Sequence, residues 1–361
     1  MYIVISEDIV KNALDKYSCS KDLCITIMTE LALGAFRGHH FVYIENYKKY
    51  KNNLWSAKIL TRQLMAGVER GSDYEGKSIV DKIKIFAVVS LNDKDYEKYK
   101  NQYPNHQLIW INPNHHKTLE LSEETHLLTE NLNDGKFFKP LVIRHLKRKC
   151  KLGNFNVSYL NRNGGGATTA DVYADEIKKA NHFCLVITDS DKKHPDDTMG
   201  KTAESIKDKR PSTYHFAAEY FMEEVMEVEN LIPRSFLPHS HNWQKELIKK
   251  DLSYYDIKLG LSLNTLAIDK YYNYWLTILG NQHLQHTLRD YQIRLIKEDP
   301  KTQIVKGWGE GILKNFLDKN DNIDNLEQTK DNQLTESQIY EWDAIGQKVI
   351  DWCIAIKPSR C

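Results

Sequence analysis

The sequence predicts an α/β protein with a parallel sheet core in residues 121–235, an α/β region in residues 1–120 and a mostly helical region in residues 236–361. Two observations lead to this prediction. Short apolar runs alternate with helical segments in the middle of the chain, which is typical of parallel sheets. Beyond Pro238, apolar residues recur at helical spacing instead. With 361 residues, the chain is long enough for two or three domains.

The N-terminal region is expected to open with a helix capped by Ser6 and to continue with a helix from Leu23 to Leu33. Further along come an apolar run at 83–89, a charged helical stretch at 93–100 and a second apolar run at 108–111. Strand, helix and strand in this order predict a βαβ unit.

The middle region is expected to hold four strands, the first three each followed by a helix. Pro140 should lie in the first turn of the helix after the first strand, or kink that helix, because proline lacks an amide donor. The expected strands are 127–129, 156–160, 184–188 and 226–228.

The C-terminal region is expected to contain a polar linker at 318–332 and a long last helix. Thr335 and Gln338 have the spacing of a capping box at the start of that helix. An apolar stripe along the helix indicates a packing face rather than a site of chemistry. The stripe consists of Ile339, Trp342, Ile345, Val349, Trp352 and Ile356.

Composition and charge exclude several classes of protein. The sequence has no apolar run of about 18 residues, so no membrane span is expected. Its first residues also lack the features of a signal peptide. The 6 cysteines form no CxxC pair, which argues against a cysteine zinc site or a disulfide framework and favours a cytoplasmic location. The net charge is +1, so a nucleic-acid surface would require local segregation of charge.

Acidic residues end three of the expected strands. Glu130 follows the first strand, Asp189 and Asp191 follow the third, and Glu229 follows the fourth. In an open parallel sheet, ligands bind beyond the carboxyl ends of the strands. In extended backbone, residues i and i+2 point the same way, so Asp189 and Asp191 are expected to address one hard cation such as Mg²⁺. A single acid of this kind is usually a solvated loop residue, and the matched positions carry the argument.

Four segments resemble the Toprim domain of OLD-like nucleases, and they occur in the order typical of that family. Glu130–Phe138 is similar to the first motif, which has a strand-ending Glu and an Asp four residues later. Asn163–Gly166 resembles the glycine turn, and Asp189–Asp191 resembles the DxD motif. Glu227–Pro233 resembles the strand that carries a later acid followed by Asn. Asn131 departs from the pattern, since many members have Gly there.

The resemblance implies a Mg²⁺- or Mn²⁺-dependent nuclease that cleaves phosphodiester bonds in DNA or RNA. Glu130, Asp189 and Asp191 would be catalytic and would hold the main metal ion, while Asp134 and Glu229 would support a second one. The resemblance also implies an effector role in bacterial anti-phage defence, with a sensor or ATPase protein as partner. Whether the chain forms a homo-oligomer is left open.

Basic residues follow the acids along the chain, and phosphate contacts require such positive density. For the helix after Glu130, a solvated charged face explains the pattern equally well. The loop after Asp191 is the better candidate for nucleic-acid binding, because it must leave the edge of the sheet. Its basic residues are Lys192, Lys193, Lys207, Lys209 and Arg210.

Two other functions stay open. A nucleotide-sugar glycosyltransferase also holds its metal on a strand-terminal DxD, but it has no need for the ExxxD formed by Glu130 and Asp134. A non-catalytic, Toprim-like assembly module would have no need for the acidic positions, which are all present here. Gly200-Lys201-Thr202 is not a P-loop, because Pro195 stands where the motif needs glycine.

Overall fold

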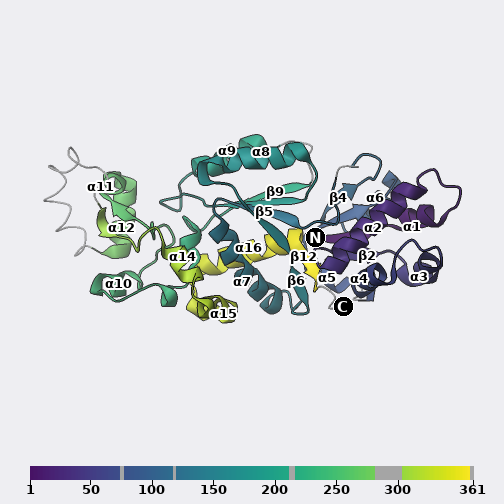
Figure 1. Ribbon diagram of the computed structural model, residues 1–361. Coiled ribbons are helices and arrows are strands. Elements are labelled where there is room, and N and C mark those ends of the chain that lie inside the picture. Colours follow the sequence, from purple (N-terminus) through teal and green to yellow (C-terminus); the bar gives the residue numbers. More distant parts are fainter. Residues whose placement is uncertain (74–76, 117–118, 211–215, 281–302, 358–361) are drawn as a thin grey trace. The chain divides into compact units, whose positions relative to one another are not determined.

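The computed structural model describes residues 1–361 except 74–76, 117–118, 211–215, 281–302 and 358–361 (Figure 1). The chain divides into two compact units, each made of separate stretches of sequence. The α/β fold class with parallel sheets is confirmed. The three-region division expected from the sequence stays a prediction. The first unit is Met1–Val186, Lys209–Tyr220 and Ile345–Cys361, and the second is Ile187–Asp208 and Phe221–Ala344.

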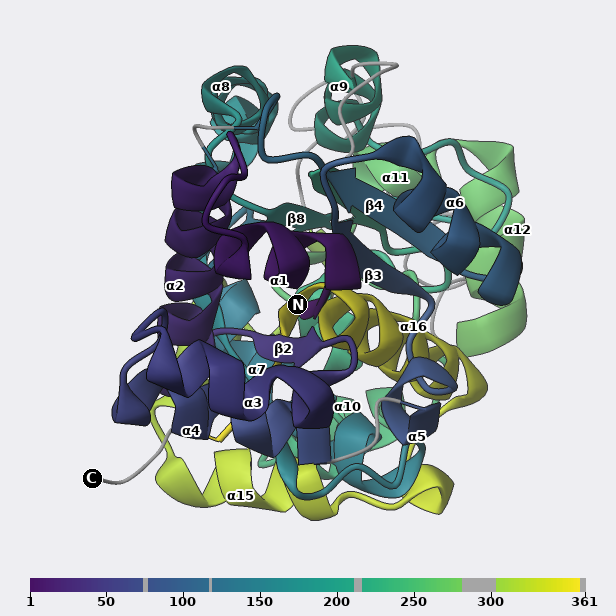
Figure 2. The ribbon, with the colours of Figure 1, turned by 90° about the vertical axis from the view of Figure 1, so that its right-hand side faces the viewer.

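Four parallel strands form the N-terminal sheet of the first unit, in the order β2-β1-β3-β4. The expected βαβ unit is confirmed as β3, α6 and β4, with α6 beside β4 in Figure 2. The elements are β1 (Tyr2–Ile5), α1 (Glu7–Leu14), α2 (Lys21–Arg37), β2 (Phe41–Ile44), α3 (Tyr47–Ser56), α4 (Arg62–Asp73), α5 (Lys77–Val80), β3 (Ile85–Val89), α6 (Asp93–Gln102) and β4 (Gln107–Ile111).

Three details of this region differ from the sequence-based expectation. The chain opens with a strand, β1, whose residues are all buried, as a continuous apolar run in a central parallel strand should be. Ser6 precedes α1 without capping it, and its hydroxyl donates to the Val89 carbonyl oxygen (2.6 Å). The helix expected to end before Gly34 continues to Arg37, where Gly38 in the left-handed conformation (φ 80°) terminates it.

A second four-stranded sheet has the order β7-β5-β8-β9 and belongs to the first unit, apart from the last residues of β8 and β9. The His126 amide donates to the Phe183 carbonyl oxygen (2.8 Å), and the Cys184 amide donates to that of Phe216 (2.9 Å). Since β5 and β7 are paired in parallel, these bonds show that all four strands start at one edge. The elements are β5 (Thr125–Thr129), α7 (Leu132–Arg148), β6 (Phe155–Val157), β7 (Tyr159–Asn163), η1 (Gly166–Thr168), α8 (Thr169–Lys179), β8 (Cys184–Thr188), α9 (Lys201–Lys209) and β9 (Ala217–Phe221).

Two expectations for this sheet are wrong in detail, and one of the two alternatives for Pro140 is ruled out. The fourth strand is not 226–228, which leads into the short helix η2 (Val228–Leu231), but β9, whose residues are mostly half-buried and form no long apolar run. The segment 156–160 contains the end of β6 and the start of β7, which lie in different sheets. Helix α7 already begins at Leu132, so Pro140 lies inside it rather than in its first turn, and the alternative that Pro140 kinks the helix stays a prediction.

The last helix, α16 (Glu336–Cys353), confirms the expected capping box: the Thr335 amide donates to Gln338 Oε1 and the Gln338 amide to Thr335 Oγ1, both over 3.1 Å. Its apolar stripe is buried, except for the half-buried Ile339. The strand that follows, β12 (Ile354–Ile356), pairs antiparallel with β6, beside which it lies in Figure 1.

The second unit is mostly helical, as expected, with one antiparallel strand pair, β10 and β11. The expectation of a linker at 318–332 is wrong, because α15 occupies most of this segment. None of the helices in the described parts of the chain is long and apolar enough to cross a membrane. The elements are η2, η3 (Arg234–Phe236), α10 (Asn242–Leu247), β10 (Gly260–Ser262), α11 (Leu263–Leu266), α12 (Asp269–Leu279), β11 (Gln303–Lys306), α14 (Ile312–Leu317), α15 (Asn320–Gln328) and η5 (Asp331–Gln333).

Candidate metal centre

The segment Asp189–Asp191 leaves β8 in a sharp turn. Asp191 adopts the left-handed conformation with φ 55°, which Asp tolerates better than most residues. The expectation of an extended segment is therefore wrong, and its two carboxylates do not follow the alternation of a strand. Between them Ser190 is buried, and its hydroxyl donates to the Val225 carbonyl oxygen (2.6 Å).

Gly200 leaves room for the carboxylate of Asp191. A Cβ atom at position 200 would lie 2.2 Å from Asp191 Oδ2, and the Gly200 amide donates to the Ser190 carbonyl oxygen (2.7 Å). Asp191 as a whole is exposed, but its carboxyl group is packed against Gly200. The resulting loss of water raises the pKa of Asp191, while the charges of Lys258 and Lys193 act in the opposite direction.

Backbone hydrogen bonds hold this turn against the segment before η2. The amides of Ser190 and Asp191 both donate to the Met226 carbonyl oxygen (3.1 and 3.0 Å). The Val228 amide donates to Asp189 Oδ1 (3.0 Å). The DxD turn and the following acidic segment therefore form one substructure, although more than thirty residues separate them in sequence.

Lys258 lies among the carboxylates of this substructure. Its Nζ is 2.7 Å from Glu227 Oε2 and 3.5 Å from Glu229 Oε2. Burial alone would lower the pKa of Lys258, but the charges of Glu227, Glu229 and Asp189 outweigh it and raise this pKa. We call Asp189, Asp191, Glu227 and Glu229 the acidic cluster. Lys258 stays protonated beside these carboxylates and is their counter-ion.

Glu227 is the most deeply buried member of the acidic cluster, with 5% of its surface exposed. Burial and then repulsion by Glu229 raise the pKa of Glu227 to about 8, although Lys258 opposes both. Its Oε1 atom is buried and has no hydrogen-bond partner among the residues that the structure describes. Sequence reasoning missed Glu227 and Lys258. The Glu-x-Glu spacing could have indicated the former, whereas nothing around Lys258 marks it.

Glu130 and Asp134 belong to the first unit, whereas the other predicted ligands belong to the second. Glu130 directly follows β5, and its carbonyl oxygen accepts bonds from the amides of Gly165 and Gly166 (3.1 Å each), so the expected glycine turn is present. Asp134 is buried in the first turn of α7, where its Oδ2 accepts the Asn131 amide (2.8 Å). Asp134 thus caps a helix, a structural role that the sequence analysis did not assign.

Most of the basic residues predicted to hold phosphates contact the protein itself. Lys193 instead lines a cavity of about 310 Å³ within the second unit, together with Tyr254, Asp256, Ser262 and Asn264. Among the other four, Lys192 contacts the Glu223 carbonyl oxygen and Lys207 the Phe221 ring. Lys209 contacts Asp171, and Arg210 contacts Glu219.

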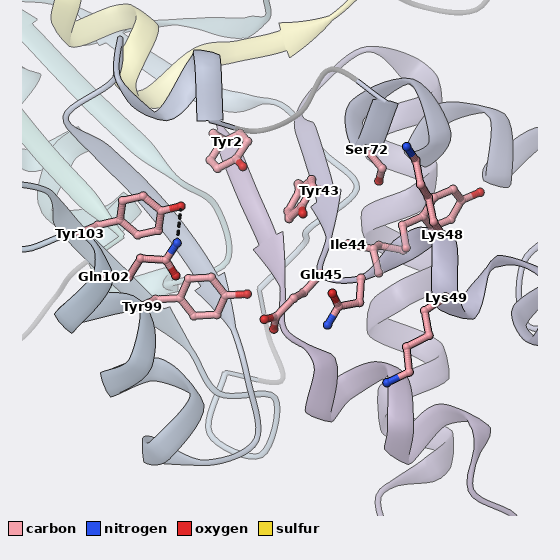
Figure 3. A pocket seen from close by; sticks show the side chains of 12 residues that line it. Tyr2, Tyr43, Ile44, Glu45, Lys48, Lys49, Ser72, Tyr99, Gln102 and Tyr103 are labelled. Carbon is pink, nitrogen blue, oxygen red and sulfur yellow. Dashed lines mark hydrogen bonds between the residues drawn. The ribbon is translucent and has the colours of Figure 1, made fainter.

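A larger cavity of about 510 Å³ lies in the N-terminal part of the first unit. Tyr2 and Tyr43 reach it from two strands, Tyr99 and Gln102 reach it from α6, and Tyr103 directly follows that helix (Figure 3). Burial is the main cause that raises the pKa of Tyr99 and Tyr103, so both phenols are neutral at ordinary pH. The cavity offers stacking and hydrogen bonds to a small ligand, but none of the residues that line it was predicted to bind metal or nucleic acid.

Comparison with family models, with curated proteins and with solved structures gave no match for this chain.

Proposed function

We propose that this protein is a Mg²⁺- or Mn²⁺-dependent nuclease that cleaves phosphodiester bonds in DNA or RNA. The acidic cluster around Lys258 is the observation that carries the proposal. Carboxylates crowd together only where positive charge offsets their repulsion, and oxygen donors suit hard divalent cations.

Two features of the acidic cluster fit a cation. Glu227 Oε1 is a buried oxygen without a hydrogen-bond partner among the described residues, and a bound ion would give it one. Lys258 supplies a single positive charge to several acids. By the resemblance, Glu130, Asp189 and Asp191 would hold the main ion, and Asp134 and Glu229 would support a second one. Asp134 fits the role of second-ion ligand less well, because one of its oxygens already accepts the Asn131 amide.

When bound, Mg²⁺ would polarise the phosphodiester and lower the pKa of the attacking water. The chain's own residues have distinct tasks around it. Gly200 leaves the space that the Asp191 carboxylate occupies, and Lys258 limits repulsion among the acids. Lys193 would bind a substrate phosphate at the cavity that it lines. Glu130, whose backbone the glycine turn fixes, would take part in proton transfer.

Cleavage assays on DNA and RNA panels in Mg²⁺ or Mn²⁺ test this proposal. Glu130→Gln, and Asp189→Ala combined with Asp191→Ala, should each reduce cleavage by about 100-fold or more while the circular dichroism spectrum is unchanged. Asp196→Asn is the matched control, because this exposed acid on the same loop lies outside the acidic cluster. Full cleavage by a folded Glu130→Gln protein would contradict the assignment.

The same variants separate the two alternatives. A glycosyltransferase would keep most of its activity after Glu130→Gln, since its DxD alone would hold the nucleotide sugar's metal. A non-catalytic assembly module would show no cleavage in the wild type. The resemblance to OLD-like nucleases further supports an effector role in anti-phage defence with a sensor or ATPase partner, and Glu130→Gln should then abolish protection in a phage-challenge assay.

A further inference from the structure

A second group of metal-ligand side chains lies where the strands of the β7-β5-β8-β9 sheet begin. His126 is the second residue of β5, Glu176 lies on α8, and His182 lies in the connection between α8 and β8. One ligand atom from each lies within 4.8 Å of the other two. The three residues belong to the first unit, whereas the acidic cluster belongs to the second.

The three side chains are packed closely together. His126 Nδ1 is 2.8 Å from Glu176 Oε2, and both residues are buried. The rings of His126 and His182 are stacked, with centroids 4.0 Å apart and an angle of 21° between their planes. Stacked imidazoles make no hydrogen bond to each other. His182 Nδ1 instead lies 2.8 Å from Asn181 Oδ1, so His182 Nε2 is the nitrogen that would bind an ion.

Two further residues surround the group. Arg162 Nη2 lies 3.5 Å from Glu176 Oε1, which leaves Oε2 directed to His126. Glu120 Oε2 lies 3.5 Å from His182 Nε2, and Glu120 is half exposed. Arg162 is thus placed to orient the buried carboxylate, and Glu120 offers another oxygen on the solvent side.

The donor types suit a metal ion. Two imidazoles and one carboxylate lie together here, and each offers one ligand atom. Neutral imidazole with carboxylate is a donor set that Zn²⁺ uses.

We propose that His126, Glu176 and His182 bind Zn²⁺, or a transition metal with the same preferences, and that the ion fastens the connection before β8 to the start of β5. Tetrahedral ligand atoms lie roughly 3.4 Å apart. The wider separations, which are at most 4.8 Å, therefore have to shorten, while the 2.8 Å pair of His126 and Glu176 has to open slightly. His182 can make this movement, because it lies in a connection and is the least buried of the three. The three proposed ligands include no cysteine. A search of the sequence for CxxC pairs therefore does not reveal this site.

Metal titration of the untagged, chelator-treated full-length protein tests the proposal. We expect one tightly bound Zn²⁺ per chain that raises the melting temperature, and Co²⁺ should give the visible absorption of a tetrahedral site. His182→Gln should weaken Zn²⁺ binding by about 100-fold or more and abolish the Co²⁺ bands. Arg162→Gln, which changes only the group that orients Glu176, should weaken binding about tenfold.

Two controls make the result decisive. His115→Gln changes an exposed histidine and should leave Zn²⁺ binding unchanged. Asp189→Ala with Asp191→Ala should do the same, which separates this site from the acidic cluster. The proposal is overturned if the protein binds no Zn²⁺, or if His182→Gln binds it as tightly as the wild type. Either result would show that His126 and Glu176 form a hydrogen-bonded pair without a metal.

Discussion

The ammonium group of Lys258 lies 2.7 Å from a carboxylate oxygen of Glu227 and 3.5 Å from one of Glu229. A lysine in this position supplies the positive charge that the acidic cluster needs when no metal ion is bound. The lysine and a divalent cation then stabilise the same carboxylates, so the loss of one should make the protein more dependent on the other.

Lys258→Met tests this dependence. In chelator, we expect the free energy of unfolding to fall by about 2 kcal/mol, because the variant leaves partly buried carboxylates without a counter-ion. Mg²⁺ or Mn²⁺ should raise the melting temperature of the variant more than that of the wild type. Lys249→Met, which removes an exposed pair with Glu246, should cost less than about 0.5 kcal/mol. Equal metal responses in Lys258→Met and wild type would contradict the relationship.

Gly200→Ala should displace the Asp191 carboxylate. The new Cβ would lie 2.2 Å from Asp191 Oδ2 and 2.5 Å from Asp191 Cβ, so the turn has to shift together with the carboxylate. We expect cleavage to fall about tenfold or more, because the carboxylate moves from its place in the acidic cluster. Gly153→Ala is the control, since its Cβ would meet only Lys147 Cγ at 3.8 Å. Unchanged cleavage in Gly200→Ala would remove Asp191 from the metal centre.

The candidate site was predicted from the sequence only in part. Acids directly after apolar strands located Glu130 and Asp189, because strand ends are marked by local pattern. Lys258 could not be located, since its position beside Glu227 depends on how distant segments pack. The geometry of Asp191 also escaped prediction, because its left-handed backbone is set by the bonds from the turn to Met226.

Lys193 and Arg210 should respond differently to neutralisation. Lys193→Gln should weaken nucleic-acid binding and reduce the salt slope by about 1, because one phosphate contact and its counter-ion release are lost. Arg210→Gln should have little effect, since Arg210 is paired with Glu219 at 2.8 Å. Binding measured between low and moderate salt distinguishes them. If Arg210→Gln has the larger effect, the phosphates lie elsewhere than the Lys193 cavity.

The raised pKa of Asp351 should make the free energy of unfolding depend on pH. Burial raises the pKa of Asp351 to about 6, against bonds from the Lys84 amide and Gln347 that lower it. The folded state therefore holds this proton more tightly than the unfolded chain, so the contribution of Asp351 is present below about pH 4 and is lost as pH rises through 6.

Asp351→Asn should remove this dependence. Relative to wild type, the free energy of unfolding of the variant should rise by about 2 to 3 kcal/mol between pH 4 and pH 7, as measured by urea denaturation. Asp81→Asn, at an exposed acid, is the control and should change little. A variant that differs from wild type by the same amount at both pH values would show that Asp351 stays protonated or exposed.

Apolar runs predicted the strands of the fold where burial is continuous, as in β3 and β8. The strand β9 was missed because its residues Ala-Ala-Glu-Tyr-Phe are mostly half-buried and carry no such run. The segment 226–228, in which apolar Met226 and Val228 flank Glu227, forms no strand, because its residues are buried by tertiary packing rather than by strand pairing. Apolar runs alone cannot separate these two causes of burial.

The partner strand of β6 comes from the other end of the chain. Residues 345–361 complete the first unit, where β12 pairs with β6 and the Thr125 hydroxyl donates to the Trp352 carbonyl oxygen (2.8 Å). During synthesis the ribosome must therefore finish the whole second unit before β6 gains this partner. Until then the nascent chain exposes an unpaired strand edge, which invites wrong pairing. The segment that pairs with β6 is thus made only after the second unit.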